Sequence, residues 1–249
     1  MATLAELARN HTDLEPDAVV HMQRLVGSWN MLADLCFADL ILFARTTDAE
    51  PTFVVLGQMR PTTSQTLHRE DFVGRLISDV DRPLVERAWR LGEIVEGEVA
   101  VSDHGERARV QCIPVRRNGQ VLGVLTRESA LAVGRRPGEL ERTYVSTFDR
   151  FARMIVRGEY PFDTDDLDTE ESPRVGDGVL VLDASGRVEY ASPNAVNALH
   201  RMGIHSNIEG ARFDEVGVEE TAVSRAFFAA APVTEEVERR PDVIVLMRC

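Results

Sequence analysis

The chain has 249 residues, enough for one or two domains with hydrophobic cores of their own. Its net charge of −13 disfavours a nucleic-acid partner, because affinity for phosphate backbones comes largely from Lys and Arg. The longest apolar run, residues 226–231, is much shorter than the ~20 residues of a transmembrane helix, and the first 15 residues lack a signal-peptide pattern. We therefore expect a soluble, cytoplasmic protein without a membrane partner.

The first part of the chain predicts an antiparallel sheet with helices at both of its ends. Pro16 suits a first helical turn, and apolar residues at spacings of three and four continue from there to Phe37. Asn118 and Gly119 stand between two apolar runs, which is the strongest short signal for a β-hairpin. The other expected elements are strands at 40–45, 52–59, 111–115 and 120–126, and helices at 82–91 and 138–157.

The first and last of these helices each carry an apolar face. Two interpretations stay open: both faces cover the sheet, or the two helices pair with each other in a bundle, within one chain or between the two chains of a homodimer. The candidates for this helix or dimer interface are Leu25, Trp29, Leu32, Tyr144, Phe148 and Phe151.

An acidic segment divides the chain. Residues 163–174 contain six carboxylates and almost no apolar side chain, so this segment cannot bury enough surface to pack. We predict a first domain at residues 1–160, a linker at 161–174 and a second domain at 175–249.

The second domain begins with a predicted strand pair and a capped helix. Strands at 178–182 and 187–191 flank a turn that ends at Gly186, and Ser192 with Pro193 begins a helix. A second helix at 218–230 and strands at 235–238 and 243–247 follow. Both domains are thus α+β, each an antiparallel sheet with helices.

Three stretches carry a resemblance to a known family. Residues 113–129, IPVRRNGQVLGVLTRES, resemble the last hairpin of GAF domains, and residues 178–195, GVLVLDASGRVEYASPNA, resemble the opening of a PAS domain. The N-terminal LAELARNHTDL and GSWNMLADLCFADLILFAR, together with QMRPTTSQT, resemble the same group of proteins. In this order the features resemble the sensor region, GAF-like then PAS-like, of actinobacterial cytosolic two-component sensor histidine kinases.

The resemblance implies a signal-sensing module in a phosphorelay. Family members continue into a kinase core that uses ATP and Mg to autophosphorylate a histidine, and they pass the phosphoryl group to a response regulator. His200 does not match a phosphoacceptor box, and no ATP-binding box is visible, so we expect no catalytic residue and no cofactor in this chain. The resemblance implies a PAS sheet of five strands, but only four strand candidates precede Cys249, from which we expect that the natural protein is longer or that a segment is missing here.

Several side chains are candidates for lining a ligand cavity. In the GAF-like domain these are Met59, His68, Trp89 and Cys112, and in the PAS-like domain they are Tyr190, Asn194 and Met202. For each of them, packing in the core is the competing interpretation. His104 lies beside Asp103 and Glu106, where a solvated turn is favoured over a cation site, and we expect no metal. The identity of the signal stays open.

Two other classes of function fit the residues less well. The chain could serve as the input module of a phosphatase or a transcription regulator, which the fold alone does not distinguish. A GAF-type sulfoxide reductase would need an attacking Cys of low pKa and a second Cys within reach. We expect Cys36 on a helix and Cys112 on a strand, which disfavours that reaction.

Overall fold

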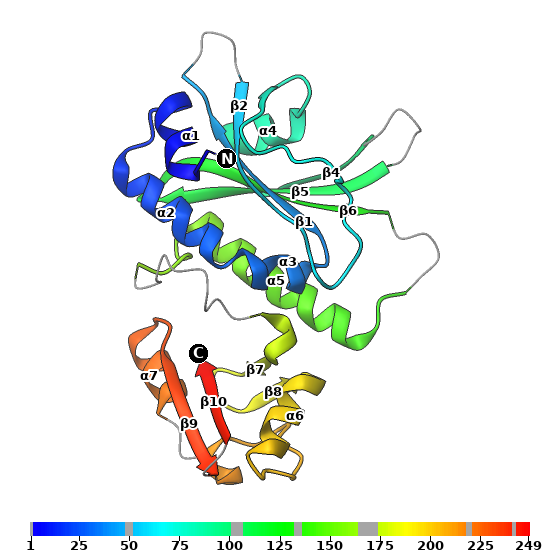
Figure 1. The fold of residues 1–249 in the computed structure, drawn as a ribbon, viewed down its shortest axis with the longest axis vertical. Coiled ribbons are helices and arrows are strands. Elements are labelled where there is room, and N and C mark those ends of the chain that lie inside the picture. The colour runs from blue at the N-terminus through cyan, green and yellow to red at the C-terminus, as the bar shows by residue number, and fades with distance from the viewer. Residues whose placement is uncertain are drawn as a thin grey trace. The chain divides into compact units, whose positions relative to one another are not determined.

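The computed structural model describes residues 2–47, 52–100, 107–131, 136–163, 174–217, 221–240 and 243–249. The chain divides into two compact units, Met1–Ser172 and Pro173–Cys249 (Figure 1). Most of the predicted linker, residues 164–173, lies outside the described residues, as do His104 and its neighbours. No helix in the described ranges is both long and apolar enough to span a membrane.

The first unit contains a six-stranded sheet in which all neighbouring strands are antiparallel. The strand order is β3-β2-β1-β6-β5-β4, so the first and last long strands lie side by side at the centre. The strands are β1 (Asp39–Arg45), β2 (Thr52–Met59), β3 (Leu76–Ser78), β4 (Val95–Ala100), β5 (Arg107–Arg117) and β6 (Gln120–Ala130).

The predicted hairpin is confirmed between β5 and β6. Arg117 pairs with Gln120, and the two residues between them both have positive φ, 50° at Asn118 and 80° at Gly119. Two consecutive positive φ values match the right-handed twist of the paired strands, and Asn-Gly tolerates them best. Both strands are longer than expected, since β6 continues four residues past the predicted end at residue 126.

The predicted helix at 16–37 is two helices, α2 (Pro16–Gly27) and α3 (Trp29–Cys36). The break falls at Ser28, whose hydroxyl donates a 2.8 Å hydrogen bond to the carbonyl oxygen of Leu25. A serine hydroxyl in such a position competes with backbone amides for the carbonyl oxygens of the helix, and the preceding Gly27 has low helix propensity. Both effects favour the end of α2 at this point. The other helices of this unit are α1 (Leu4–His11), α4 (Pro83–Leu91) and α5 (Glu139–Arg157), and α3 contacts α5 (Figure 1).

Helices cover both faces of this sheet. Trp29 of α3 and Met22 of α2 reach β2 and β6 on one face, at Gly57 and Gly123, where a larger side chain would collide with them. On the other face, Val85 and Ala88 of α4 pack into an apolar cluster. The strand residues of that cluster are Ile41, Phe43, Phe53, Val55, Val95, Val110, Cys112 and Val124.

The second unit has two separate antiparallel strand pairs around one apolar core. The pairs are β7 (Leu180–Leu182) with β8 (Val188–Ala191), and β9 (Thr234–Arg240) with β10 (Val243–Arg248). Helix α6 (Pro193–Arg201) begins as predicted, because the Ser192 hydroxyl accepts a hydrogen bond from the Ala195 amide. Helix α7 (Ala222–Ala229) lies within the predicted helix at 218–230, whose first three residues are not among the described ones.

Candidate polar site in the first unit

A buried polar cluster around Glu128 lies on the α4 face of the sheet. The Glu128 side chain is 1% exposed, and its carboxylate accepts hydrogen bonds from three directions. The donors are His68 Nε2 at 2.7 Å, Arg82 Nη1 at 2.7 Å and the Thr126 hydroxyl at 2.8 Å. A buried carboxylate is tolerated when it is paired and hydrogen-bonded in this way.

The three donors come from segments that the fold brings together. Thr126 and Glu128 are two residues apart on β6, so they face the same side of the sheet. Arg82 directly precedes α4, and its guanidinium lies over the Phe43 ring at 5.7 Å. His68 belongs to the segment between β2 and β3 and packs edge-on against Phe72 at 5.0 Å between ring centroids. The cluster therefore ties β6, α4 and the segment between β2 and β3 to one another.

Two further buried carboxylates hold the segment that carries His68. Asp39 at the start of β1 accepts hydrogen bonds from the Thr66 hydroxyl at 2.8 Å and from the backbone amides of Leu67 and His68. Asp34 in α3 accepts from the amide of Thr62 at 2.7 Å and from its hydroxyl at 2.8 Å. The QMRPTTSQT stretch, residues 58–66, runs from the end of β2 into this segment, and its Thr62 and Thr66 are among the groups that bind the two carboxylates.

The electrostatics of the cluster favour a charged carboxylate. Burial opposes ionisation of Glu128, but the hydrogen bond from His68 and the charge of Arg82 outweigh it and lower its pKa to about 2. Burial, and then the negative charge of Glu128, raise the pKa of the nearby Cys112 thiol far above its ordinary value, while Arg82 acts in the opposite direction. The site thus offers a buried carboxylate anion held by three hydrogen-bond donors, and its cysteine is not an activated nucleophile.

The two buried cysteines do not form a redox pair. Burial also raises the pKa of Cys36, to about 12. Cys112 lies in the apolar cluster under α4. Cys36 is the last residue of α3, and its carbonyl oxygen accepts a hydrogen bond from Arg127 of β6. Because side chains alternate along a strand, Arg127 faces the side of the sheet opposite to Thr126 and Glu128, so Cys36 lies on the opposite side from Cys112. Cys36 and Cys112 are therefore not placed as an attacking and a resolving Cys, which disfavours a sulfoxide reductase built on these two residues.

Three of the four cavity candidates of this unit lie on the α4 face. Cys112 is fully buried there, Trp89 packs edge-on against Phe53 at 6.3 Å between ring centroids, and His68 binds Glu128. Met59 does not join them. It pairs with Leu40 on the face that α2 and α3 cover, because the irregular pairing between Leu42 and Phe43 shifts the alternation along β2.

Sequence reasoning missed Glu128 and Arg82. The predicted strand ends at residue 126, which leaves Glu128 outside it, whereas β6 continues to Ala130 and Glu128 is an inward-facing position within it. A carboxylate two residues past an inward threonine, in a strand that continues, is the signal that could have identified it.

Five of the six predicted interface residues are buried in their own unit, and Phe151 is half-buried. Leu25, Trp29, Leu32 and Phe148 are fully buried. Tyr144 stacks on Phe37 at 6.1 Å between ring centroids, and Phe151 packs edge-on against Tyr160 at 5.0 Å. Within the chain both interpretations apply, because α3 and α5 contact strands of the sheet and also contact each other. Contact between two chains stays an untested prediction.

The cavity candidates of the second unit do not share one pocket. Asn194 is exposed, and its side-chain amide donates a 2.8 Å hydrogen bond to the Gly176 carbonyl oxygen. Met202 is buried in the core, and Tyr190 is half-buried on β8. A pocket of about 360 Å³ opens beside them, but its walls are residues of α6 and of the segment at 204–209, with Ala191.

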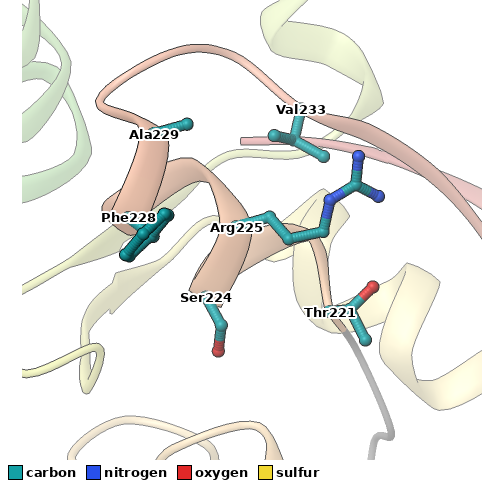
Figure 2. A pocket seen from close by; sticks show the side chains of 6 residues that line it. All are labelled: Thr221, Ser224, Arg225, Phe228, Ala229 and Val233. Carbon is teal, nitrogen blue, oxygen red and sulfur yellow. The ribbon is translucent and has the colours of Figure 1, made fainter.

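A second hollow of about 620 Å³ lies along α7 (Figure 2). Its walls are Thr221, Ser224, Arg225, Phe228, Ala229 and Val233. The Phe228 ring is 96% exposed, so the hollow is a feature of the surface and not an enclosed cavity. Among the residues that the structure describes, no group of three or more His, Cys, Asp and Glu side chains is arranged to hold a metal ion.

Comparison with known proteins places this architecture in a family. Residues 4–148 match the family of the GAF domain of the histidine kinase PdtaS. The chain is 40% identical over 214 residues to the sensor histidine kinase PdtaS of Mycolicibacterium smegmatis and 39% identical over 215 residues to that of Mycobacterium tuberculosis. Each match covers 84% of this chain and 42% of the relative, so the chain spans less than half the length of these relatives.

A solved structure described as the sensor region of a sensor histidine kinase resembles nearly the whole chain. The TM-score is 0.84 at 32% sequence identity, and the match covers 99% of this chain and 91% of that one. The chain therefore belongs to the PdtaS family of histidine kinase sensor regions, with its GAF domain at residues 4–148.

Proposed function

We propose that this chain is the signal-input region that controls autophosphorylation of a kinase core and phosphotransfer from it to a response regulator. The observation that supports this most is the match to a solved sensor region across 99% of the chain. In this proposal ATP and Mg bind to the kinase core, outside residues 1–249, and the protein works in the cytoplasm.

The proposed sensing element is the Glu128 cluster. A signal can shift a protein between two arrangements only if it binds one of them better than the other. Here the segment between β2 and β3, α4 and β6 meet at a single carboxylate, so a signal that binds near α4 and displaces His68 or Arg82 would disturb all three segments together. Coupling of about 1–3 kcal/mol between such a site and the output changes the output about 5- to 150-fold.

The second unit is, in this proposal, a PAS-like domain. Two strands, a capped helix, a second helix and two further strands follow one another in this unit, and both strand pairs contribute to one apolar core. The turn between β7 and β8 supports the same assignment, because the Asp183 carboxylate accepts from the amides of Ser185 and Arg187 and sets the hairpin.

A domain exchange tests the proposal. Residues 1–249 replace the matching region of the Mycolicibacterium smegmatis PdtaS, and ATP-dependent autophosphorylation is measured for the wild-type exchange and for Glu128→Gln. We expect an active kinase whose rate changes at least about fivefold in the variant. The matched control is Glu98→Gln, which removes a carboxylate from an exposed pair with Arg107 on the edge strand β4 and should leave the rate unchanged.

Two results would contradict the proposal. One is an exchanged kinase whose rate is the same for wild type, Glu128→Gln and Glu98→Gln. The other is hydrolysis of ATP by purified residues 1–249 alone, since that would place catalysis in this chain.

A further inference from the structure

Two arginines of the first unit meet at one carboxylate oxygen. Arg24 Nη1 and Arg117 Nη1 each lie 3.1 Å from Oδ1 of Asp163. The two arginine side chains are 20% and 22% exposed, whereas the Asp163 side chain is 75% exposed. The two arginine side chains are thus mostly buried in the unit, and the Asp163 carboxylate contacts them from the solvent side.

Local structure positions each of the two arginines. Arg24 lies on α2, one turn after His21 and on the same side of the helix. Arg117 is the last residue of β5, directly before the Asn118–Gly119 turn, so the hairpin geometry determines where its side chain begins. A helix and a hairpin thus set where the two side chains begin, and both guanidinium groups reach the same carboxylate oxygen.

A neutral histidine lies behind the pair. His21 is 2% exposed, and Arg117 Nη1 lies 3.3 Å from its Nδ1. Burial, and then the charge of Arg117, lower the pKa of His21 to about 4, while Asp163 acts in the opposite direction. At neutral pH the imidazole is uncharged and can accept from Arg117, so it orients this guanidinium without adding a third positive charge.

Aromatic contacts bring Asp163 to the arginines. After α5 the chain turns at Gly158, and Tyr160 packs edge-on against Phe151 of α5 at 5.0 Å and against Phe162 at 5.5 Å between ring centroids. Asp163 follows directly, and it is the last described residue before 164–173.

We propose that Arg24 and Arg117 form an oxyanion-binding site whose resident ligand is the carboxylate of Asp163 and which a free oxyanion can occupy in its place. Two like charges held a few ångströms apart repel, and an anion between them relieves that repulsion through charge-assisted hydrogen bonds. An exposed ion pair is weak and exchanges readily, so the Asp163 carboxylate can leave without unfolding the unit. Binding of a free oxyanion would then release the start of the acidic segment from the first unit.

Nuclear magnetic resonance of residues 1–249 tests whether the Asp163 carboxylate occupies the site. The readouts are the side-chain Nε–Hε signals of Arg24 and Arg117 at pH 7 and the titration of the His21 ring. In Asp163→Asn we expect both arginine signals to move and the pKa of His21 to fall, because a nearby negative charge is lost. The matched control is Glu159→Gln. Glu159 lies four residues before Asp163, and its carboxylate pairs with Arg157 at 2.8 Å. If Asp163→Asn leaves these signals as the control does, Asp163 is not the ligand and the proposal is wrong.

Titration with inorganic phosphate at pH 7 tests the second half of the proposal. We expect phosphate to move the Arg24 and Arg117 signals of Asp163→Asn at concentrations about threefold or more below those that move them in wild type, where the carboxylate competes. The double variant Arg117→Gln, Asp163→Asn should show no such change, and its amide spectrum reports whether it is folded. Phosphate that moves neither signal in Asp163→Asn, or that acts equally on the folded double variant, would overturn the site.

Discussion

Two strands with the same kind of sequence are buried very differently. The central strand β1 and the strand β10 of the second unit are both nearly continuous apolar runs. In β1, six of the seven residues are buried, because strands flank it on both sides and helices cover both faces. In β10 burial alternates, and Ile244 and Leu246 are more than half exposed. An apolar run therefore indicates a strand, but the number of covered faces depends on what packs against it.

The largest expected effect is the loss of an aromatic side chain from β1. Phe43→Ala should lower the free energy of unfolding of the first unit by about 3–5 kcal/mol, because Phe43 is fully buried and its removal leaves a cavity. Denaturant unfolding followed by tryptophan fluorescence measures this change, since Trp29 and Trp89 both belong to the first unit.

The matched substitution in β10 is Leu246→Ala. Its side chain is 56% exposed, and we expect the free energy of unfolding of the second unit to fall by less than about 1 kcal/mol. The intensity of the amide resonances of the second unit measures this unfolding. Comparable losses for Phe43→Ala and Leu246→Ala would mean that β10 is as well covered as β1, and the comparison would fail.

A smaller effect is expected from the polar part of the same sheet. Glu128→Ala should cost about 3 kcal/mol, because it leaves the partly buried Arg82 and the buried His68 without their carboxylate. Glu98→Ala, which breaks a pair that is 40% and 60% exposed, should cost less than about 1 kcal/mol in the same fluorescence measurement. Equal costs would indicate that the Glu128 cluster contributes no more than a surface pair.

The stability of wild type should also depend on pH through Glu128. Its pKa in the folded state is about 2, below the ordinary 4.5, so the folded state binds this proton less readily than the unfolded state. The stabilisation is therefore complete above about pH 5 and is lost as the pH falls from there towards 2. The difference in unfolding free energy between wild type and Glu128→Gln, measured from pH 6 to pH 3, should shrink over this range, and a constant difference would contradict the assignment.

A local effect of intermediate size is expected at the cap of α6 in the second unit. Ser192→Ala removes the hydroxyl that accepts from the amides of Ala195 and Val179, and should cost about 1–2 kcal/mol. Amide hydrogen exchange of α6 measures this local change. Hydrogen exchange in α5 of the first unit should stay as in wild type, which would show that the effect is confined to the second unit. Unchanged exchange in α6 would show that the cap is dispensable.

Features that depend on neighbouring residues were predictable. The Asn118–Gly119 hairpin and the Ser192 cap each follow from a few consecutive residues, and both are confirmed. The break at Ser28 was missed because the apolar spacing continues across it, although the hydrogen bond that ends α2 is itself local. Met59 is predicted to share a cavity with Cys112, but the irregular pairing of β2 with β1 places it on the opposite face of the sheet.

The sequence by itself determined the turns, the caps, the apolar faces and the family resemblance, since each of these is encoded within a short stretch of chain. Only the tertiary structure decided which distant residues meet. His68 is 60 residues from Glu128, Arg82 is 46 residues from it, and Arg24 is 139 residues from Asp163. Such contacts depend on strand order, pairing register and helix placement, which result from packing the whole unit and leave no periodic signal at the residues involved.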